Sequence, residues 1–125
     1  MLDRIYILTL SLLVTHQIDA AYWKEWELFL VPGEIQFFDI FNLAVIPVLL
    51  VGFKSVVLMK KSGYYYSYFL SSLGLLTFLI HSGFYWNGYR QFTLPVSLAV
   101  IILCAVSAVI QLIVTIRQRE VFQYE

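Results

Sequence analysis

Two histidines and several acids stand within the apolar stretches of this 125-residue sequence. His16 and Asp19 are three residues apart, so on a helix both side chains project from the same face. His81 lies in a second, distant apolar stretch. Two imidazoles and one carboxylate are the smallest ligand set typical of protein-bound zinc or non-haem iron. The pattern therefore predicts a divalent metal, zinc or iron, held by His16, Asp19 and His81.

The same groups also suit acid–base chemistry without a metal. A histidine beside a carboxylate in a low-dielectric site can exchange protons near neutral pH. Glu27 lies about two helical turns beyond Asp19 and would extend such a site or relay protons. The candidate catalytic residues are thus His16, Asp19, Glu27 and His81. A small or lipidic ligand would contact the polar and aromatic residues expected nearby: Asp39, Asn42, Arg90, Trp23 and Tyr85.

Composition places these residues in a membrane protein. Apolar residues make up 61% of the chain and charged residues 13%, and the mean hydropathy is +0.81. A soluble domain of this size cannot bury that much apolar surface. The eight basic and eight acidic residues cancel, so nucleic acid is not expected as a partner. With one cysteine, a disulfide scaffold is excluded, and the lipid bilayer is the expected environment.

Four apolar stretches are long enough to cross about 30 Å of hydrocarbon as helices. Since backbone groups in lipid must bond internally, an up-down helix bundle is the expected arrangement. The predicted fold class is therefore all-α: an integral membrane four-helix bundle that forms a single domain over residues 1–125. Its predicted spans are residues 2–31, 37–59, 64–85 and 94–116.

The first of these stretches is the least regular. Charged residues interrupt its second half before the helix stop at Pro32-Gly33. We expect one long helix whose end leaves the hydrocarbon. A cleaved signal peptide is the alternative for its first half, but Ile18-Asp19-Ala20 is a poor cleavage site.

The distribution of basic residues predicts the orientation. Six lie on one side of the predicted bundle, whereas only Lys24 and Arg90 lie on the other. The positive-inside rule then places both termini in the cytoplasm.

Depth estimates predict that the polar groups meet in the outer half of the bundle. At 1.5 Å per residue, His16 lies ~16 Å and His81 ~25 Å above the inner boundary. This difference of ~9 Å makes a haem held between the two histidines unlikely. We expect a polar cavity lined by His16, Asp19, Glu27, Asp39, Asn42 and His81.

Small and weakly polar residues form a stripe on each of the last two predicted helices. Small side chains let helix backbones approach closely in lipid, so the stripes predict helix packing. Because His81 falls on the first stripe, it is expected to face the interior of the bundle. The stripes comprise Ser67, Ser71, Gly74, His81 and Tyr85, and Ser97, Cys104, Ala108, Gln111 and Thr115.

The segment from His16 to Phe29 resembles the opening signature of an uncharacterised family of small bacterial four-span membrane proteins, His-x-x-Asp-Ala followed by Glu-Trp. The resemblance implies a multi-pass protein of the bacterial inner membrane and brings no activity with it. It also singles out Glu25, which on one continuous helix points away from His16. The family signature and the helix geometry agree on Glu25 if the helix breaks near residues 20–22. The matching positions are His16, Asp19, Ala20, Glu25, Trp26, His81, Pro95 and Ser97.

The four-span topology is also similar to that of the sterol isomerase and sigma-2 receptor fold. That fold uses intramembrane acidic residues, and this chain lacks enough matching acidic positions to carry their roles over.

Two functional hypotheses remain open from the sequence. In the first, a metal or acid–base site acts on a small or lipidic ligand. In the second, the chain is a non-enzymatic structural, assembly or accessory subunit of a membrane complex, and its polar residues bond to one another across helices. The first requires the side chains of His16, Asp19 and His81 to meet at a common point, whereas the second disperses them.

Overall fold

Short breaker segments divide the chain into helices. The structure, a computed structural model, describes residues 1–123. Four helices are long: α1 (Leu2–Tyr22), α3 (Glu34–Val57), α4 (Gly63–Trp86) and α5 (Pro95–Gln118). The single-turn α2 (Glu25–Leu28) lies between α1 and α3, and a 3₁₀ helix, η1 (Arg119–Gln123), follows α5.

The breakers act through ordinary backbone chemistry. Gly33 precedes α3 with φ of +97° and Gly88 follows α4 with φ of +89°, conformations that glycine adopts without steric cost. Pro95 occupies the first turn of α5, where a missing N–H breaks no helical hydrogen bond.

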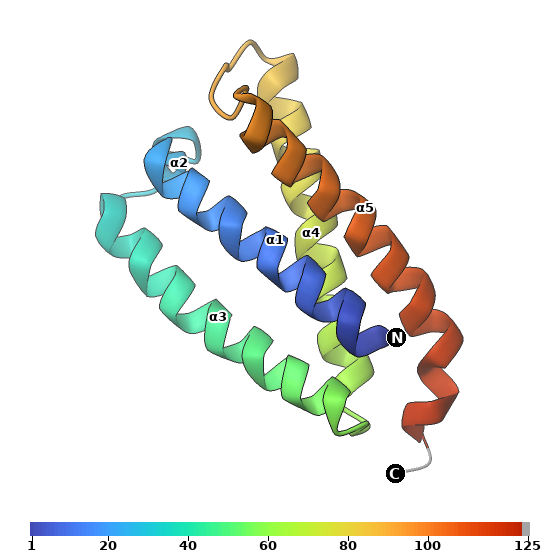
Figure 1. Cartoon of the computed structure of the whole chain (residues 1–125). Coiled ribbons are helices and arrows are strands. Elements are labelled where there is room, and N and C mark those ends of the chain that lie inside the picture. The colour runs from blue at the N-terminus through green and yellow to red at the C-terminus, as the bar shows by residue number, and fades with distance from the viewer. Residues whose placement is uncertain (124–125) are drawn as a thin grey trace.

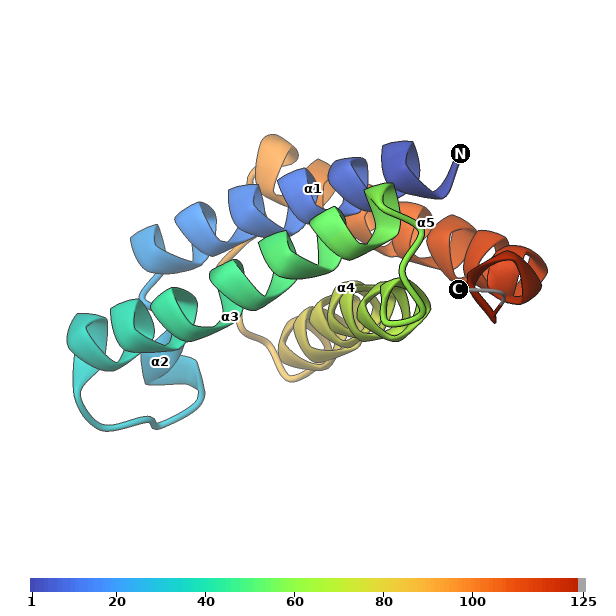
Figure 2. The same ribbon diagram turned by 90° about the horizontal axis from the view of Figure 1, so that it is seen from below.

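The four long helices pack in chain order around the bundle (Figure 1). α1 contacts both α3 and α5, α4 also contacts both, and α1 meets α4 across the centre. Within residues 1–123 no contact joins α3 and α5, so these two helices flank the central pair. Figure 2 shows α1 and α3 running alongside one another with α4 below them. The predicted all-α bundle of four packed helices is confirmed.

The prediction of one continuous helix over residues 2–31 is wrong. α1 ends at Tyr22, and Lys24 adopts the left-handed conformation with φ of 52° and ψ of 53°. Lys24 donates its backbone N–H to the Ala21 carbonyl, which satisfies one carbonyl at the helix end. The charged residues that follow thereby leave the line of α1.

The stripes of small residues lie where the helices pack. The small residues of both stripes are buried: Gly74 lies against Cys104 and Ala108, and Ser67 bonds to Gln111 and Thr115. A Cβ added at Gly74 would lie 2.8 Å from the Ala108 Cβ, closer than two carbon atoms can approach. The predicted packing role of the stripes is therefore confirmed, although Tyr85, at the end of the first stripe, is exposed.

The outer surface of the bundle is strongly apolar. Within the part of the chain that the structure describes, three helical segments are long and apolar enough to cross a membrane: α3, α4 and the continuous segment Pro95–Phe122. Large side chains such as Leu43, Leu79 and Ile116 are more than half exposed on these helices. α1 is less apolar and is not among the three. The structure thus supports a multi-pass membrane protein.

Candidate metal centre

The turn after α1 folds the chain back and brings a carboxylate to the bundle. Because Lys24 is left-handed, α2 turns away from the axis of α1, and Glu25 becomes buried with 8% of its surface exposed. Aromatic contacts hold α2 in place: Trp26 packs on Phe38 of α3, with ring centroids 5.6 Å apart. Phe29 packs on Phe84 of α4, with centroids 5.4 Å apart.

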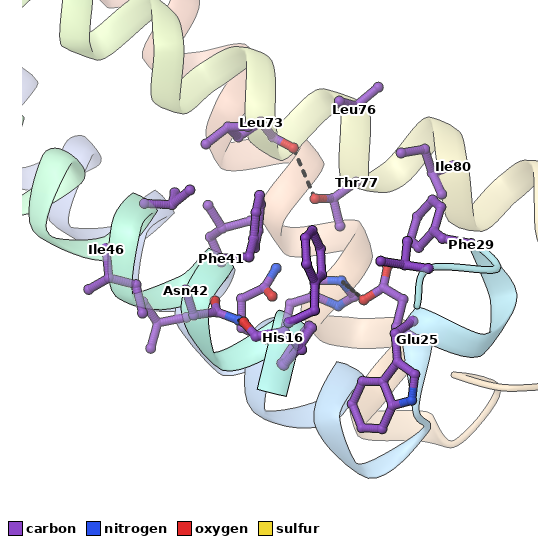
Figure 3. Close-up of a pocket in the computed structure, with 18 of the residues that line it drawn as sticks. His16, Glu25, Phe29, Phe41, Asn42, Ile46, Leu73, Leu76, Thr77 and Ile80 are labelled. Carbon is purple, nitrogen blue, oxygen red and sulfur yellow. Dashed lines mark hydrogen bonds and ion pairs between the residues drawn. The ribbon is translucent and has the colours of Figure 1, made fainter. Parts of the chain in front are cut away.

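Glu25 meets both histidines of the chain. The Nε2 atoms of His16 and His81 are 3.1 Å apart. His81 Nε2 lies 3.3 Å from Glu25 Oε1, and His16 Nε2 lies 3.8 Å from Glu25 Oε2. All three side chains are buried, and Figure 3 shows His16 and Glu25 side by side among apolar side chains. Three groups from α1, α2 and α4 therefore point at one another.

These separations fit ligands of a single divalent ion. Zinc binds imidazole nitrogen at about 2.0–2.1 Å and carboxylate oxygen at about 2.0–2.2 Å. Two ligand atoms at such distances lie about 2.9 Å apart at a right angle and about 3.4 Å apart at the tetrahedral angle. The contacts of 3.1 and 3.3 Å fall in this range, and the third, at 3.8 Å, is slightly longer. His16, Glu25 and His81 could thus hold a metal ion.

Aromatic side chains cover the three groups. Phe92, in the loop before α5, is 2% exposed, and its ring centroid lies 4.3 Å from that of His81 and 5.6 Å from that of His16. The ring centroid of Phe84 lies 5.9 Å from that of His81. Phe92 has φ of 65°, so the loop turns sharply to place this ring. The cover keeps bulk water away from the cluster and strengthens electrostatic interactions within it.

A second carboxylate lies one turn from His16. Among the described residues, the buried Nδ1 atom of His16 and the buried Oδ2 atom of Asp19 have no hydrogen-bond partner. A histidine that binds a metal through Nε2 usually donates its Nδ1–H to a carboxylate or carbonyl. Asp19, predicted as a ligand, is not part of the group whose ligand atoms lie together, in which Glu25 supplies the carboxylate.

The predicted depth offset between the histidines is wrong. Measured from the helix ends near the site, His16 is six residues before the end of α1 and His81 five residues before the end of α4. At 1.5 Å per residue these distances agree to within about 2 Å. The start of α1 lies short of the lower ends of α3 and α5 in Figure 1. Counting from the N-terminus therefore underestimated the height of His16, and the argument from depth against haem does not hold.

The other predicted site residues are spread around this end of the bundle. Glu27 is exposed and pairs with Lys24 at 3.7 Å. Arg90 stacks over the Tyr85 ring at 4.6 Å, and both are exposed. Glu27, Tyr85 and Arg90, the three predicted site residues among these, do not line the cavity that lies between α1, α2, α3 and α4 beside the cluster.

Three more of the predicted ligand-binding residues have separate surroundings. Asp39 is exposed on α3, and Trp23 is half-buried with its ring centroid 6.3 Å from that of Phe92. Asn42 lines the cavity and donates its Nδ2–H to the Phe38 carbonyl. Their roles in binding a ligand stay predictions.

The cavity beside the cluster is mostly apolar, which differs from the polar cavity expected. It has a volume of about 260 Å³ and lies between α1, α2, α3 and α4. Its wall includes two of the three clustered groups, His16 and Glu25, whereas His81 is not part of the wall. Its polar lining residues are His16, Gln17, Glu25, Asn42 and Thr77.

Reasoning from helix periodicity missed Glu25 and Phe92. A regular helix extended through Lys24 places Glu25 on the wrong face, because Lys24 is left-handed. The signal that could have found it was its place in the Glu-Trp part of the family signature. Phe92 sits in a loop, where periodicity carries no information about side-chain direction.

A family model matches residues 2–118, nearly the whole chain. The chain belongs to the family of unknown function DUF6713. The predicted resemblance to an uncharacterised family is confirmed to this extent, and membership brings no activity with it. No curated protein and no solved structure is significantly similar to the chain.

Proposed function

We propose that this chain is a multi-pass membrane protein whose function depends on one divalent metal ion, zinc or ferrous iron, bound by His16, Glu25 and His81. The convergence of both Nε2 atoms and one carboxylate within 3.1–3.8 Å carries this proposal. Two histidines and one carboxylate leave at least one coordination position for water or substrate. Such an ion acts as a Lewis acid or activates its bound water.

The burial of Glu25 supports a metal over a purely structural role. An unpaired carboxylate in an apolar interior is costly, and hydrogen bonds between membrane helices average under about 1 kcal/mol. A cation compensates the charge of Glu25 and binds the lone pairs of both imidazoles at once.

Elemental analysis of the purified protein tests the proposal. We expect about one zinc or iron per chain in the wild type and less than about a tenth of that in His81→Gln and Glu25→Gln, because each variant removes one of only three ligands. Glu27→Gln is the matched control, since Glu27 is an exposed acid two residues away from Glu25. Equal metal content in all four proteins, or none in the wild type after loading, overturns the proposal.

A metal-free acid–base relay is the second candidate. The 3.1 Å separation of the two Nε2 atoms also allows a hydrogen bond in which one imidazole donates and the other accepts. Glu25 Oε1, 3.3 Å from His81, would then orient the pair. A wild type that binds no metal but loses its activity in both His81→Gln and Glu25→Gln would favour this candidate.

The proposal includes the membrane topology, in which the chain crosses the membrane four times and both termini lie in the cytoplasm. The outward side chains of α1 support a fourth span, because Ile7, Leu8 and Ile18 are exposed whereas Thr9 and His16 are buried. Reporter fusions after Ser62 and after Gly88 test it. A reporter active only in the cytoplasm should work after Ser62 and fail after Gly88, and the opposite result would invert the topology.

A further inference from the structure

We infer that the cavity beside the metal site binds a single hydrocarbon chain, so that the ligand is a lipid-like molecule with one long chain and a polar head that reaches the metal. This inference rests on the proposed metal site and names the class of its ligand.

The shape of the cavity favours a chain. Its wall on α3 runs from Phe37 to Leu49, which corresponds to about 18 Å along the helix. Its volume of about 260 Å³ lies just below the usual range of about 300–1,000 Å³ for small-molecule pockets. A long, narrow space of this size suits one flexible chain better than a fused-ring ligand.

The lining residues divide the cavity into a long apolar part and a polar end. Fourteen of the lining residues are apolar. Asn42 and Thr77 each donate a hydrogen bond to a backbone carbonyl of their own helix, that of Phe38 and that of Leu73, so part of their hydrogen-bonding capacity is used within the helix. The remaining polar residues, His16, Gln17 and Glu25, lie at the metal site or one residue from it.

Gln17 offers an unused polar atom at that end. Among the described residues its buried Oε1 atom has no hydrogen-bond partner, and its side chain lines the cavity. A ligand head group with an N–H or O–H would satisfy it while another of its atoms reaches the ion. The polar end of the cavity therefore suits a head group that both donates a hydrogen bond and binds metal.

The opening of the cavity faces the apolar outer surface. The lining residues Phe37, Phe41 and Leu76 are 47%, 44% and 50% exposed. They lie on α3 and α4, two of the helices able to cross a membrane. A chain from the bilayer can therefore enter sideways between these helices without crossing water.

Hydroxamic acids of different chain length are suitable probes, because the head group binds metals and donates hydrogen bonds. The full chain is loaded with Co²⁺ in phosphatidylcholine nanodiscs, and binding is read from the visible absorption of the bound cobalt. Acetohydroxamate carries no chain, whereas palmitohydroxamate carries a long one. Since each buried methylene favours binding, palmitohydroxamate should bind at least about tenfold more tightly.

A variant that fills the cavity separates pocket binding from partition into the bilayer. Val45→Trp places a large side chain in the cavity, whereas Val48→Trp places it on the same helix outside the lining. We expect Val45→Trp to weaken palmitohydroxamate about tenfold and acetohydroxamate less than about twofold, with Val48→Trp close to the wild type. Leu76→Trp, at a half-exposed lining position, replaces Val45→Trp if that variant does not fold.

The outcomes distinguish the inference from the proposed function. Failure of the wild type to bind Co²⁺ contradicts the metal site itself. The second contradictory outcome is a protein that binds Co²⁺ but in which Val45→Trp weakens both probes equally or weakens neither. That outcome agrees with the metal site and overturns the hydrocarbon pocket.

Discussion

Residues 1–123 contain two buried polar clusters that join helices, and the clusters differ in what their atoms bond to. The serine–glutamine cluster (Ser67, Gln111, Thr115) joins α4 to α5, and the metal-site cluster (His16, Glu25, His81) joins α1, α2 and α4. In the first cluster, Gln111 Nε2 donates to Ser67 Oγ at 2.9 Å, and the hydroxyl oxygens of Ser67 and Thr115 are 2.7 Å apart. Thr115 Oγ1 also donates to the backbone carbonyl of Gln111 at 2.7 Å.

The serine–glutamine cluster consists of neutral groups in which each hydroxyl has both a donor and an acceptor nearby. Such a network fixes the contact between two helices and holds no titratable group, and within residues 1–123 its Gln111 Oε1 atom is buried without a hydrogen-bond partner. The metal-site cluster presents three titratable groups whose lone pairs face one another. The comparison teaches that burial alone does not separate the two clusters; the chemistry of their groups does, because one is neutral and the other combines two imidazoles with a carboxylate.

Blocking the approach of α4 to α5 should have the largest effect. Gly74→Leu places a side chain where even a Cβ would lie 2.8 Å from Ala108, so we expect no folded protein. Gly83→Leu on the same helix is the matched control, because nothing lies within 4 Å of a Cβ there. Folded yield by size-exclusion chromatography and circular dichroism measures both. A folded Gly74→Leu protein would contradict the packing role of the stripe.

Metal should stabilise one cluster and not the other. Because the proposed ion would bind only the folded site, excess zinc at about 100 times its Kd should stabilise the wild type by about 2.7 kcal/mol. Thermal unfolding with zinc and with chelator should show this gain in Gln111→Leu as well, and lose it in His81→Gln. The same zinc-dependent gain in His81→Gln would mean that the ion binds elsewhere.

Breaking the serine–glutamine cluster should have a smaller effect on stability. Gln111→Leu leaves Ser67 Oγ without its donor, and we expect a loss of about 1–2 kcal/mol. Metal content should stay unchanged. Unfolding in denaturing detergent together with elemental analysis checks both statements, and loss of metal in this variant would show that the clusters are coupled.

Asp19 should act on the metal through His16. Asp19→Asn keeps all three proposed ligands but removes the carboxylate charge one helical turn from His16, so the metal should bind about tenfold more weakly. The stability of the metal-free variant should match that of the metal-free wild type. Competition with a chromophoric chelator measures the affinity. Unchanged affinity would remove Asp19 from the site.

The turn before Glu25 should give the smallest effect. Lys24 holds φ of 52°, which costs a residue with a Cβ about 1 kcal/mol and costs glycine little. Lys24→Gly should therefore raise the free energy of unfolding by up to about 1 kcal/mol and retain the metal. Lys24→Ala is the control that removes the charge but keeps the strain. Destabilisation by Lys24→Gly alone would show that the turn is not strained.

The residues that pack α4 against α5 could be predicted one by one from the sequence. Ser67, Gly74, Ala108 and Gln111 repeat at helical spacing, and helices in contact must bury the faces that carry small side chains. On the metal side, the interior position of His81 followed from the same argument. The partnership of His16 with Glu25 did not, because it depends on a single left-handed residue that no periodicity reveals.

By itself, the sequence determined the helices and the faces they bury, because runs of apolar residues and the spacing of small ones act through local geometry. The tertiary structure decided which groups meet. The height of His16 relative to His81 depends on how far α1 is shifted along the bundle, and the position of Glu25 depends on how α2 packs on Phe38 and Phe84. Both are set by contacts between segments far apart in the chain, which the local pattern of residues does not contain.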